Sequence, residues 1–324
     1  MSQRIALLFA GQGAQAVGMG KDLADRYAAA AELFANADAL LERPLSRTIF
    51  DGPEEALTQT KNCQPALFVH GLATLAALRE EAGDLPIHAA AGLSLGEFTA
   101  HAAAGTFDFE TGLRLVQQRG NFMQEACEQT VGAMAALIGG DEGAVRALAA
   151  ETDVDVANLN SPGQIVISGE TAKVALAVSL AKEHGARVAK MLNVAGAYHS
   201  RLMNSAFVRL GEALRQVTFH PPLFPVICNI DAQPVRDPEE ILSSLQDQVT
   251  STVRWTESME YLVDEEQCDL FIELGPGGVL AGLLNRTRKG TPCISIADAA
   301  SLQAALPTIR AALATDPQPA PERI

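Results

Sequence analysis

A serine between two glycines is the first place in this chain where covalent chemistry could occur. Residues 92–96 read G-L-S-L-G, with a short apolar stretch before them and a helical pattern that begins at Leu95. In such a strand-to-helix turn, small flanking residues let the chain turn sharply, so that the serine hydroxyl rises above the end of the sheet. The alternative is a plain glycine-rich turn. The strand before it and the helix after it favour Ser94 as a nucleophile.

A serine hydroxyl needs a base, and histidine is the usual one. His101 lies two helical turns beyond Ser94, about 10 Å away along the helix, which is too far. His184 falls in a segment of different pattern, and His220 precedes two prolines in a loop. His199 stands where the chain returns from that segment, and junctions between domains are favoured positions for sites. From position alone, an ordinary surface histidine remains an equal interpretation of His199.

An arginine stands on the apolar face of a helix expected between residues 111 and 127. Leu115, Val116 and Met123 define that face, and Arg119 falls on the same row. An unpaired buried guanidinium is very costly, so Arg119 either extends its head group to solvent or meets an anion. A carboxylate would suit it, because two parallel hydrogen bonds match the planar guanidinium. The residues alone leave both interpretations open.

A glycine-rich turn follows the first apolar run. Gly11, Gly13 and Ala16 match the spacing of a dinucleotide-binding fingerprint. The acidic residue that should close a second strand about 20 residues later is missing, since an amphipathic helix occupies that span. We therefore interpret the turn as a source of backbone N–H groups. That of Gln12, together with that of Leu95, would form an oxyanion hole beside Ser94.

Alternating strand and helix patterns position these residues, which is typical of an α/β fold with a parallel sheet. Apolar runs predict strands at 5–9, 87–91, 226–230 and 270–273. Helical spacing predicts helices at 23–41, 64–82, 95–104 and 111–127, around 239–265, and one last helix after 275–278.

The pattern changes between residues 128 and 196, where the order becomes βαββαβ. The predicted strands are 132–138, 154–160, 164–168 and 187–194, and the predicted helices are 141–150 and 171–184. This order is typical of a ferredoxin-like unit. The predicted organisation is therefore an α/β-hydrolase-like catalytic domain of residues 1–127 and 197–315, a ferredoxin-like insert at 128–196, and a flexible tail at 316–324.

Charge and cysteine content exclude several classes of function. The chain has 24 lysines and arginines against 39 aspartates and glutamates, a net charge of −15, which repels nucleic acid and anionic membranes. Five scattered cysteines with no C-x-x-C pair argue against a disulfide framework and a metal site, and favour a reducing cytoplasm. The apolar run 5–10 is shorter than a signal peptide requires, and the uncharged stretch 62–78 is too short and polar to span a bilayer. We expect a cytoplasmic protein without a membrane segment.

Seven ordered segments resemble the malonyl-CoA:acyl carrier protein transacylases of fatty acid synthesis and the acyltransferase domains of polyketide synthases. They are residues 9–15 (FAGQGAQ), 92–97 (GLSLGE), 118–124 (QRGNFMQ), 132–134 (GAM), 160–164 (NSPGQ), 198–203 (YHSRLM) and 273–277 (ELGPG). The resemblance extends from about residue 4 to about residue 310. Two positions depart from the family pattern: Leu93 replaces a common histidine before the serine, and Tyr198 replaces a common phenylalanine. Both concern acyl preference rather than the chemistry.

The resemblance implies a role for each candidate. Ser94 is the acylated nucleophile, His199 its base and later its acid, and Arg119 the clamp on the malonyl carboxylate. The remaining implied roles are oxyanion-hole donors for Gln12 and Leu95, orientation of His199 through the backbone carbonyl for Gln248, which lies seven residues before Trp255, and a place along the coenzyme channel for Asn160.

The implied activity is transfer of a malonyl group from malonyl-CoA to the phosphopantetheine thiol of acyl carrier protein. It proceeds through a malonyl-serine with ping-pong kinetics, and needs no metal and no tightly bound cofactor. Carrier proteins of this family are acidic, so basic residues should lie at the mouth of the site, and Arg286, Arg288 and Lys289 are candidates.

Three alternatives remain open. The same fold could carry a serine hydrolase or thioesterase, or an acyltransferase of a polyketide pathway. A non-catalytic module that binds carrier proteins would fit only if Ser94, His199 and Arg119 did not converge.

Overall fold

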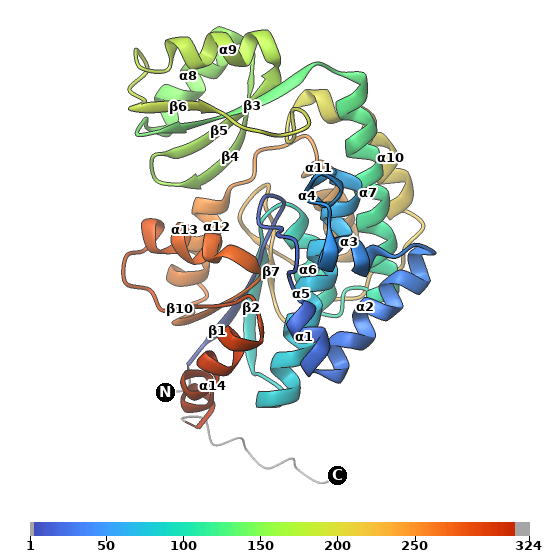
Figure 1. The fold of residues 1–324 in the computed structure, drawn as a ribbon. Coiled ribbons are helices and arrows are strands. Elements are labelled where there is room, and N and C mark those ends of the chain that lie inside the picture. Colours follow the sequence, from blue (N-terminus) through green and yellow to red (C-terminus); the bar gives the residue numbers. More distant parts are fainter. Residues whose placement is uncertain (1–2, 315–324) are drawn as a thin grey trace.

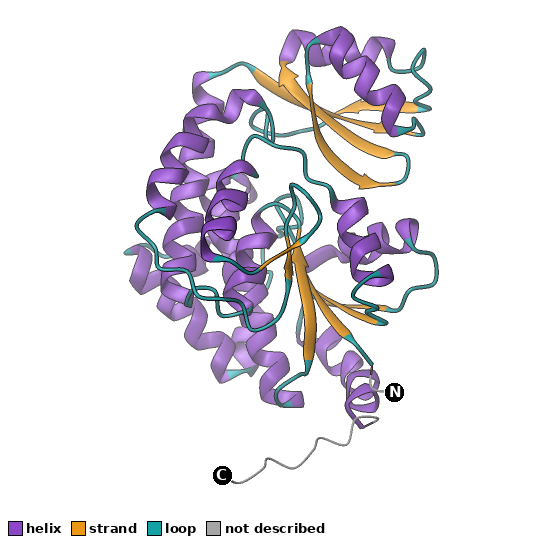
Figure 2. Ribbon diagram, turned by 180° about the vertical axis from the view of Figure 1, so that it is seen from behind, coloured by secondary structure: helices purple, strands orange, loops and turns teal. Residues whose placement is uncertain are grey.

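Two β-sheets organise the chain, and each has its own helices (Figures 1 and 2). The structure, a computed structural model, describes residues 3–314. The larger sheet is mainly parallel and the smaller one is antiparallel, so the fold is of the mixed α/β type. In Figure 1 the smaller sheet lies above the larger one, with α8 and α9 on its outer side.

The larger sheet has the strand order β10-β9-β1-β2-β7-β8. Its strands are β1 (Ile5–Phe9), β2 (Ile87–Gly92), β7 (Val226–Ile227), β8 (Pro234–Val235), β9 (Leu270–Leu274) and β10 (Cys293–Ile296). All pairs are parallel except β7 with β8. Helices cover both faces of this sheet, which explains why β1 is a continuous apolar run rather than an alternating one.

The residues of β1 divide between two apolar cores. Ile5, Leu7 and Phe9 face the core that most of the helices build, whereas Ala6 and Leu8 face the core of α12 and α13. The helices of the larger part are α1 (Lys21–Arg26), α2 (Ala28–Leu41), α3 (Leu45–Asp51), α4 (Glu54–Thr58), α5 (Thr60–Ala82), α6 (Leu95–Ala103), α7 (Phe109–Gln129), α10 (Asn204–Leu214), α11 (Pro238–Asp247), α12 (Trp255–Asp264), α13 (Val279–Thr287) and α14 (Ala299–Ala314).

The smaller sheet has the order β4-β5-β3-β6, and every neighbouring pair is antiparallel. Its elements are β3 (Gly132–Ile138), α8 (Glu142–Thr152), β4 (Asp155–Ser161), β5 (Gln164–Glu170), α9 (Thr171–Leu180) and β6 (Val188–Met191). Val145 and Leu148 of α8 and Val174 of α9 pack on one face of the sheet in a separate core.

A segment outside the smaller sheet is joined to its edge strand β4. Val253 donates its N–H to Ala157 O at 2.8 Å and accepts from Leu159 N–H at 2.9 Å, as a neighbouring strand would. Thr252 Oγ1 adds a bond to Val156 O at 2.6 Å. The next N–H, that of Arg254, donates to a residue that follows β7 of the larger sheet. This short segment therefore fastens the smaller sheet to the larger part.

The structure confirms most of the predicted elements, corrects four of them and adds others that were not predicted. The predicted helix at 23–41 is two helices, because Tyr27 has an extended backbone (φ −118°, ψ 120°) between α1 and α2. The helices α3 and α4, at 45–58, were not predicted, because they are too short to show a helical period. The strands predicted at 187–194 and 226–230 are shorter than expected. The helix after 275–278 is not the last element, since β10 and α14 follow it. The predicted tail at 316–324 lies outside the described residues.

Candidate active site

The turn between β2 and α6 holds Ser94 in a strained conformation, with φ 54° and ψ −106°. The two glycines beside it are required by close approach of the backbone. A Cβ at Gly92 would lie 1.9 Å from the carbonyl of Gly96, and a Cβ at Gly96 would lie 2.1 Å from Phe9 O. No side chain fits at those distances. The G-x-S-x-G pattern therefore reflects the packing of α6 against the ends of β1 and β2.

An asparagine from the neighbouring strand holds this turn in place. Asn229, just past the end of β7, accepts a hydrogen bond from Ser94 N–H at 2.7 Å and donates one to Gly92 O at 2.8 Å. Its side chain thus fixes the backbone on both sides of the turn. Asn229 was not predicted from the sequence, although a polar residue just after a buried apolar strand indicates a possible site residue.

His199 is placed to act as a base on Ser94. Its Nε2 lies 2.8 Å from Ser94 Oγ, and its Nδ1 lies 2.8 Å from the backbone oxygen of Gln248. A carbonyl oxygen can only accept, so Nδ1 carries the proton and Nε2 is left to accept the serine hydroxyl proton. Burial and the charge of Arg119 lower the pKa of His199 to about 4, so the imidazole is neutral at neutral pH.

Arg119 on α7 is 1% exposed, so the interpretation of an arginine that extends to solvent is wrong. Its Nη1 donates to Gln64 Oε1 at 2.7 Å, and its Nη2 donates to Gln248 Oε1 at 2.8 Å and to Ser94 Oγ at 3.1 Å. The guanidinium also lies 5.3 Å from the centre of the Phe98 ring. Burial lowers the pKa of Arg119 to about 10, which leaves the side chain charged at neutral pH.

The partners of Arg119 are neutral, and one of its donors is unused. Within residues 3–314 no carboxylate forms an ion pair with it, and its buried Nε–H has no acceptor. A buried cation with amide and hydroxyl partners is suited to an incoming anion, which it can bind with two parallel hydrogen bonds. The sequence analysis missed Gln64, whose signal was an amide within the long apolar stretch of α5.

Gln248 connects the histidine with the arginine. Its backbone oxygen accepts from His199, and its side-chain oxygen accepts from Arg119. The amide nitrogen donates to Ser94 O at 3.0 Å and to Glu97 Oε2 at 2.6 Å. Gln248 directly follows α11 in the chain and is fully buried. One residue therefore contacts the histidine, the arginine, Glu97 and the backbone of the serine turn.

Two backbone donors beside the serine are unoccupied. In the part of the chain that the structure describes, neither the N–H of Gln12 nor that of Leu95 donates to another group. Leu95 is the first residue of α6. Gln12 follows the end of β1, the strand next to β2. The side chain of Gln12 lies near Tyr198, with its Nε2 3.4 Å from the phenol oxygen.

A cavity of about 450 Å³ between the two sheets leads to Ser94. Leu93 and Tyr198, the two positions that depart from the family pattern, line it together with Asn160. The side-chain oxygen of Asn160 is itself buried and has no hydrogen-bond partner among residues 3–314.

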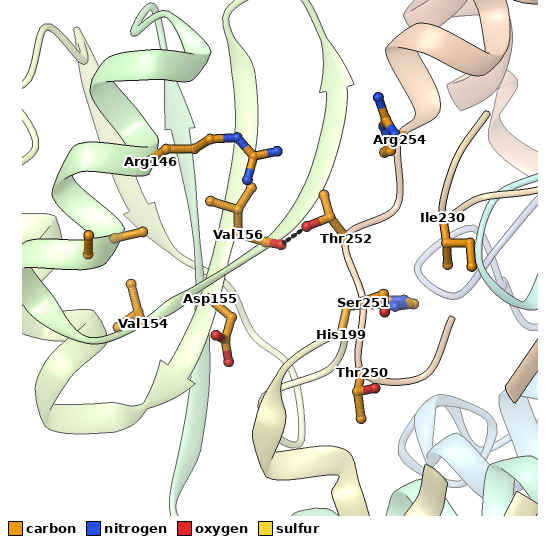
Figure 3. A pocket seen from close by; sticks show the side chains of 12 residues that line it. Arg146, Val154, Asp155, Val156, His199, Ile230, Thr250, Ser251, Thr252 and Arg254 are labelled. Carbon is orange, nitrogen blue, oxygen red and sulfur yellow. Dashed lines mark hydrogen bonds between the residues drawn. The ribbon is translucent and has the colours of Figure 1, made fainter. Parts of the chain in front are cut away.

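A second, more open cavity of about 720 Å³ lies on the other side of His199 (Figure 3). Helix α8, strand β4 and residues 250–254 form its walls. Figure 3 shows the Thr252–Val156 hydrogen bond that crosses it and the side chains of Arg146 and Arg254 at its upper rim. Each arginine already has an ion-pair partner, so this cavity presents no unpaired charge. His199 thus lines both cavities and lies between them.

Three other observations bear on the sequence interpretations. His101 is buried and its Nδ1 lies 3.0 Å from Thr106 Oγ1, away from the site. Among residues 3–314, no group of three histidine, cysteine or acidic side chains could hold a metal ion. No helix in this range is long and apolar enough to cross a membrane.

Comparison of the sequence with known proteins gives one consistent result. Residues 6–314 match the model of a family described as the acyl transferase domain. The malonyl CoA-acyl carrier protein transacylase of Bacillus subtilis is 41% identical over 312 residues, which cover 95% of this chain and 98% of the relative. A polyketide biosynthesis malonyl CoA-acyl carrier protein transacylase of the same organism is 40% identical over 290 residues, covering 88% and 97%.

Solved structures agree with the sequence comparison. The acyl-carrier-protein S-malonyltransferase of Bartonella henselae is similar with a TM-score of 0.90 and 39% identity, covering 94% of this chain and 99% of the other. A malonyl-transacylase in complex with its type II polyketide synthase acyl carrier protein gives a TM-score of 0.90 and 37% identity, with coverage of 94% and 99%.

Proposed function

This chain belongs to the acyl transferase family, and on that premise we propose that it transfers malonyl groups from malonyl-CoA to the phosphopantetheine thiol of acyl carrier protein. The observation that carries the proposal is the buried, charged guanidinium of Arg119 3.1 Å from the Ser94 hydroxyl. An acyl group on this serine brings its far end to a cation, so an acyl group that ends in a carboxylate fits best.

The first half-reaction acylates Ser94. His199 Nε2 takes the hydroxyl proton as Oγ attacks the thioester carbonyl. The resulting oxyanion accepts hydrogen bonds from the free N–H groups of Gln12 and Leu95. Collapse of the tetrahedral intermediate breaks the C–S bond, and His199 returns the proton to the thiol of coenzyme A. The product is a malonyl-serine, with its carboxylate bound by Arg119.

The second half-reaction repeats these steps with another thiol. The phosphopantetheine thiol of acyl carrier protein gives its proton to His199 and attacks the malonyl-serine, and the proton then returns to Ser94. The Gln248 carbonyl holds the histidine ring in one tautomer throughout. All groups used belong to the chain, so the mechanism requires no tightly bound cofactor, and the two substrates react in turn.

We further propose the two-domain architecture and the cytoplasmic location that the sequence predicts. The strand order of the smaller sheet and its two helices support a ferredoxin-like insert at 128–196. The parallel sheet with a serine turn supports an α/β-hydrolase-like domain formed by 1–127 and 197–315. All five cysteines are free thiols, which supports a reducing cytoplasm.

Of the three predicted basic residues, Arg286 has a contact that supports a place at the mouth of the cavity, where an acidic carrier protein would bind. Arg286 on α13 bonds Gln164, a residue that lines the cavity. Arg288 is already paired with Glu260 and Asp264, so it is a poorer candidate. We propose fatty acid synthesis as the pathway of this chain, and a polyketide pathway as the second candidate, because one relative is named as a polyketide biosynthesis transacylase.

The experiment that tests this function is mass spectrometry of the protein after addition of malonyl-CoA. We expect a malonyl adduct that persists in buffer, because a transferase must exclude water from the acyl-serine or leave it poorly activated. Addition of holo acyl carrier protein should discharge it quickly, and carriers from the two pathways can be compared directly. Rapid release of free malonate without any carrier would instead favour a hydrolase.

Replacement of His199 by alanine should slow both half-reactions by roughly 10² to 10⁴, the usual contribution of a general acid-base group. In the unchanged protein kcat/KM should stay level as the pH falls through 6 and 5 and decline near the pKa of His199, about 4. Rapid-quench measurement of acylation checks the first expectation. An acylation rate equal to that of the unchanged protein would show that another group is the base.

A further inference from the structure

Glu97 is a buried acid that the mechanism above does not use. It lies on α6, three residues after Ser94, and is 0% exposed. Its Oε2 accepts hydrogen bonds from Gln248 Nε2 at 2.6 Å and from Asn229 N–H at 3.0 Å. Its Oε1 is buried and has no hydrogen-bond partner within residues 3–314. An ionised carboxylate would leave that oxygen without the donors that buried charge requires, whereas a neutral acid can carry its proton there.

A single amide separates Glu97 from Arg119. The nitrogen of the Gln248 side chain donates to Glu97, and the oxygen of the same amide accepts from Arg119. Both side chains are buried, so little water would screen an ionised Glu97 from Arg119. The ionisation state of Glu97 therefore decides whether the pocket holds one net positive charge or none.

The groups that act on the pKa of Glu97 lie on α7, directly after α11 and in the loop after β7. Burial raises the pKa of Glu97 to about 8, although bonds from Gln248 and Asn229 and the charge of Arg119 on α7 act in the opposite direction. Asp231, in the loop after β7, acts with burial. The buried thiol of Cys228 in the same loop has a raised pKa, so it stays neutral.

We propose that Glu97 is a positioning residue that sets the charge of the acyl pocket: as a neutral acid it leaves the charge of Arg119 free for the carboxylate of the acyl group, and its ionisation weakens that selection. The proposal rests on the proposed function, because it assumes that Arg119 binds the malonyl carboxylate. It adds that selection between malonyl and acetyl groups depends on one proton held three residues from the nucleophile.

The sign of the effect follows from linkage. A bound carboxylate and an ionised Glu97 repel each other, so malonyl binding favours the protonated form and raises the pKa of Glu97 further. Preference for malonyl-CoA is therefore complete below the pKa of the free protein and declines as the pH rises through it. Acetyl-CoA carries no carboxylate, so its reaction provides the internal reference.

The test is the ratio of kcat/KM for malonyl-CoA to kcat/KM for acetyl-CoA as a function of pH. In the unchanged protein the ratio should fall about ten-fold from about pH 7 to about pH 9. In Glu97→Gln it should not change with pH, because an amide copies the neutral acid and its oxygen can still accept both bonds. Glu110→Gln, the same change at an exposed site on α7, is the matched control and should keep the fall.

Two outcomes would overturn the proposal: a ratio that does not depend on pH in the unchanged protein, or a fall that persists in Glu97→Gln. The second would assign the effect to another group. Arg119, with a pKa of about 10, and Tyr198, whose pKa burial raises, titrate above this range. Losses of activity that affect both substrates equally cancel in the ratio.

A second measurement does not depend on the fold of the Glu97 variant. Titration calorimetry of Ser94→Ala at about pH 8.5, in buffers of different ionisation enthalpy, counts the protons taken up on binding. Malonyl-CoA should take up most of one proton more than acetyl-CoA does, and equal uptake would contradict the proposal. Failure of malonyl-CoA to acylate the unchanged protein would instead reject the proposed function itself.

Discussion

Replacement of Arg119 by alanine should lower malonyl transfer by about 10² to 10⁴ and leave acetyl transfer unchanged or faster. Without its partner the malonyl carboxylate is a buried, unpaired charge, a penalty of roughly 3 to 5 kcal/mol. Acetyl-CoA does not incur this penalty. In the free protein Arg119 also donates to the serine hydroxyl, so its removal frees the nucleophile for either substrate. The measurement is kcat/KM for both thioesters together with a melting curve.

Two further variants test whether the effect depends on the guanidinium at position 119. Arg119→Lys should restore only part of the malonyl activity, because an ammonium group cannot form the two parallel hydrogen bonds of a guanidinium. Arg114→Ala, on the exposed face of the same helix, is the matched control and should change neither rate nor ratio. The clamp assignment is falsified if Arg119→Ala lowers thermal stability and both rates alike, with a constant malonyl-to-acetyl ratio.

Replacement of Ser94 by alanine should abolish the malonyl adduct completely. The substitution removes one oxygen that contacts His199 and Arg119 and leaves the Asn229 bonds to the turn intact, because those bonds use the backbone. The fold should therefore survive, as circular dichroism and a melting curve can show. Intact-mass measurement after addition of malonyl-CoA reports the adduct.

A buried serine elsewhere provides the control for this variant. Ser168 on β5 is fully buried and its hydroxyl has no hydrogen-bond partner in the described part of the chain, so Ser168→Ala removes the same atom at a position away from the active site. That protein should form the adduct at the normal rate. A malonyl mass on Ser94→Ala, at an equal rate, would place the nucleophile on another residue.

The sequence identified Ser94 more readily than its partners, for a physical reason. The serine turn is local: two glycines, one strand and one helix between residues 87 and 103 define it. His199 and Gln248 come together with it only through the order of strands in the larger sheet, which no local pattern encodes. The backbone oxygen of Gln248 has no signature at all, since every residue has one. Only resemblance to a family pointed to it.

The elements that the sequence analysis missed share weak local signals. The break at Tyr27 has no glycine or proline to mark it, and the residue still contributes its ring to the buried face. The strand Cys293–Ile296 has four residues and no clear alternation. Helix α14 contains Pro307, which reads as a terminator although it lies within the helix. The strand at 5–9 was predicted correctly because burial on both faces makes it uniformly apolar, and the buried alanines 89–91 mark the strand at 87–91 in the same way.

The short segment around Val253 has a consequence for engineering this protein by exchange of parts. Exchange of residues 132–191 for those of a relative, to change the carrier protein served, looks self-contained because the smaller sheet has its own core. That sheet is nevertheless completed by Val253, and Gln248, which supports His199, lies only five residues upstream. If the exchange stopped at the sheet, Val253 and the strand it pairs with would come from different proteins. The mismatch would lie close to His199. The transferable module is therefore discontinuous: the insert together with residues 248–254.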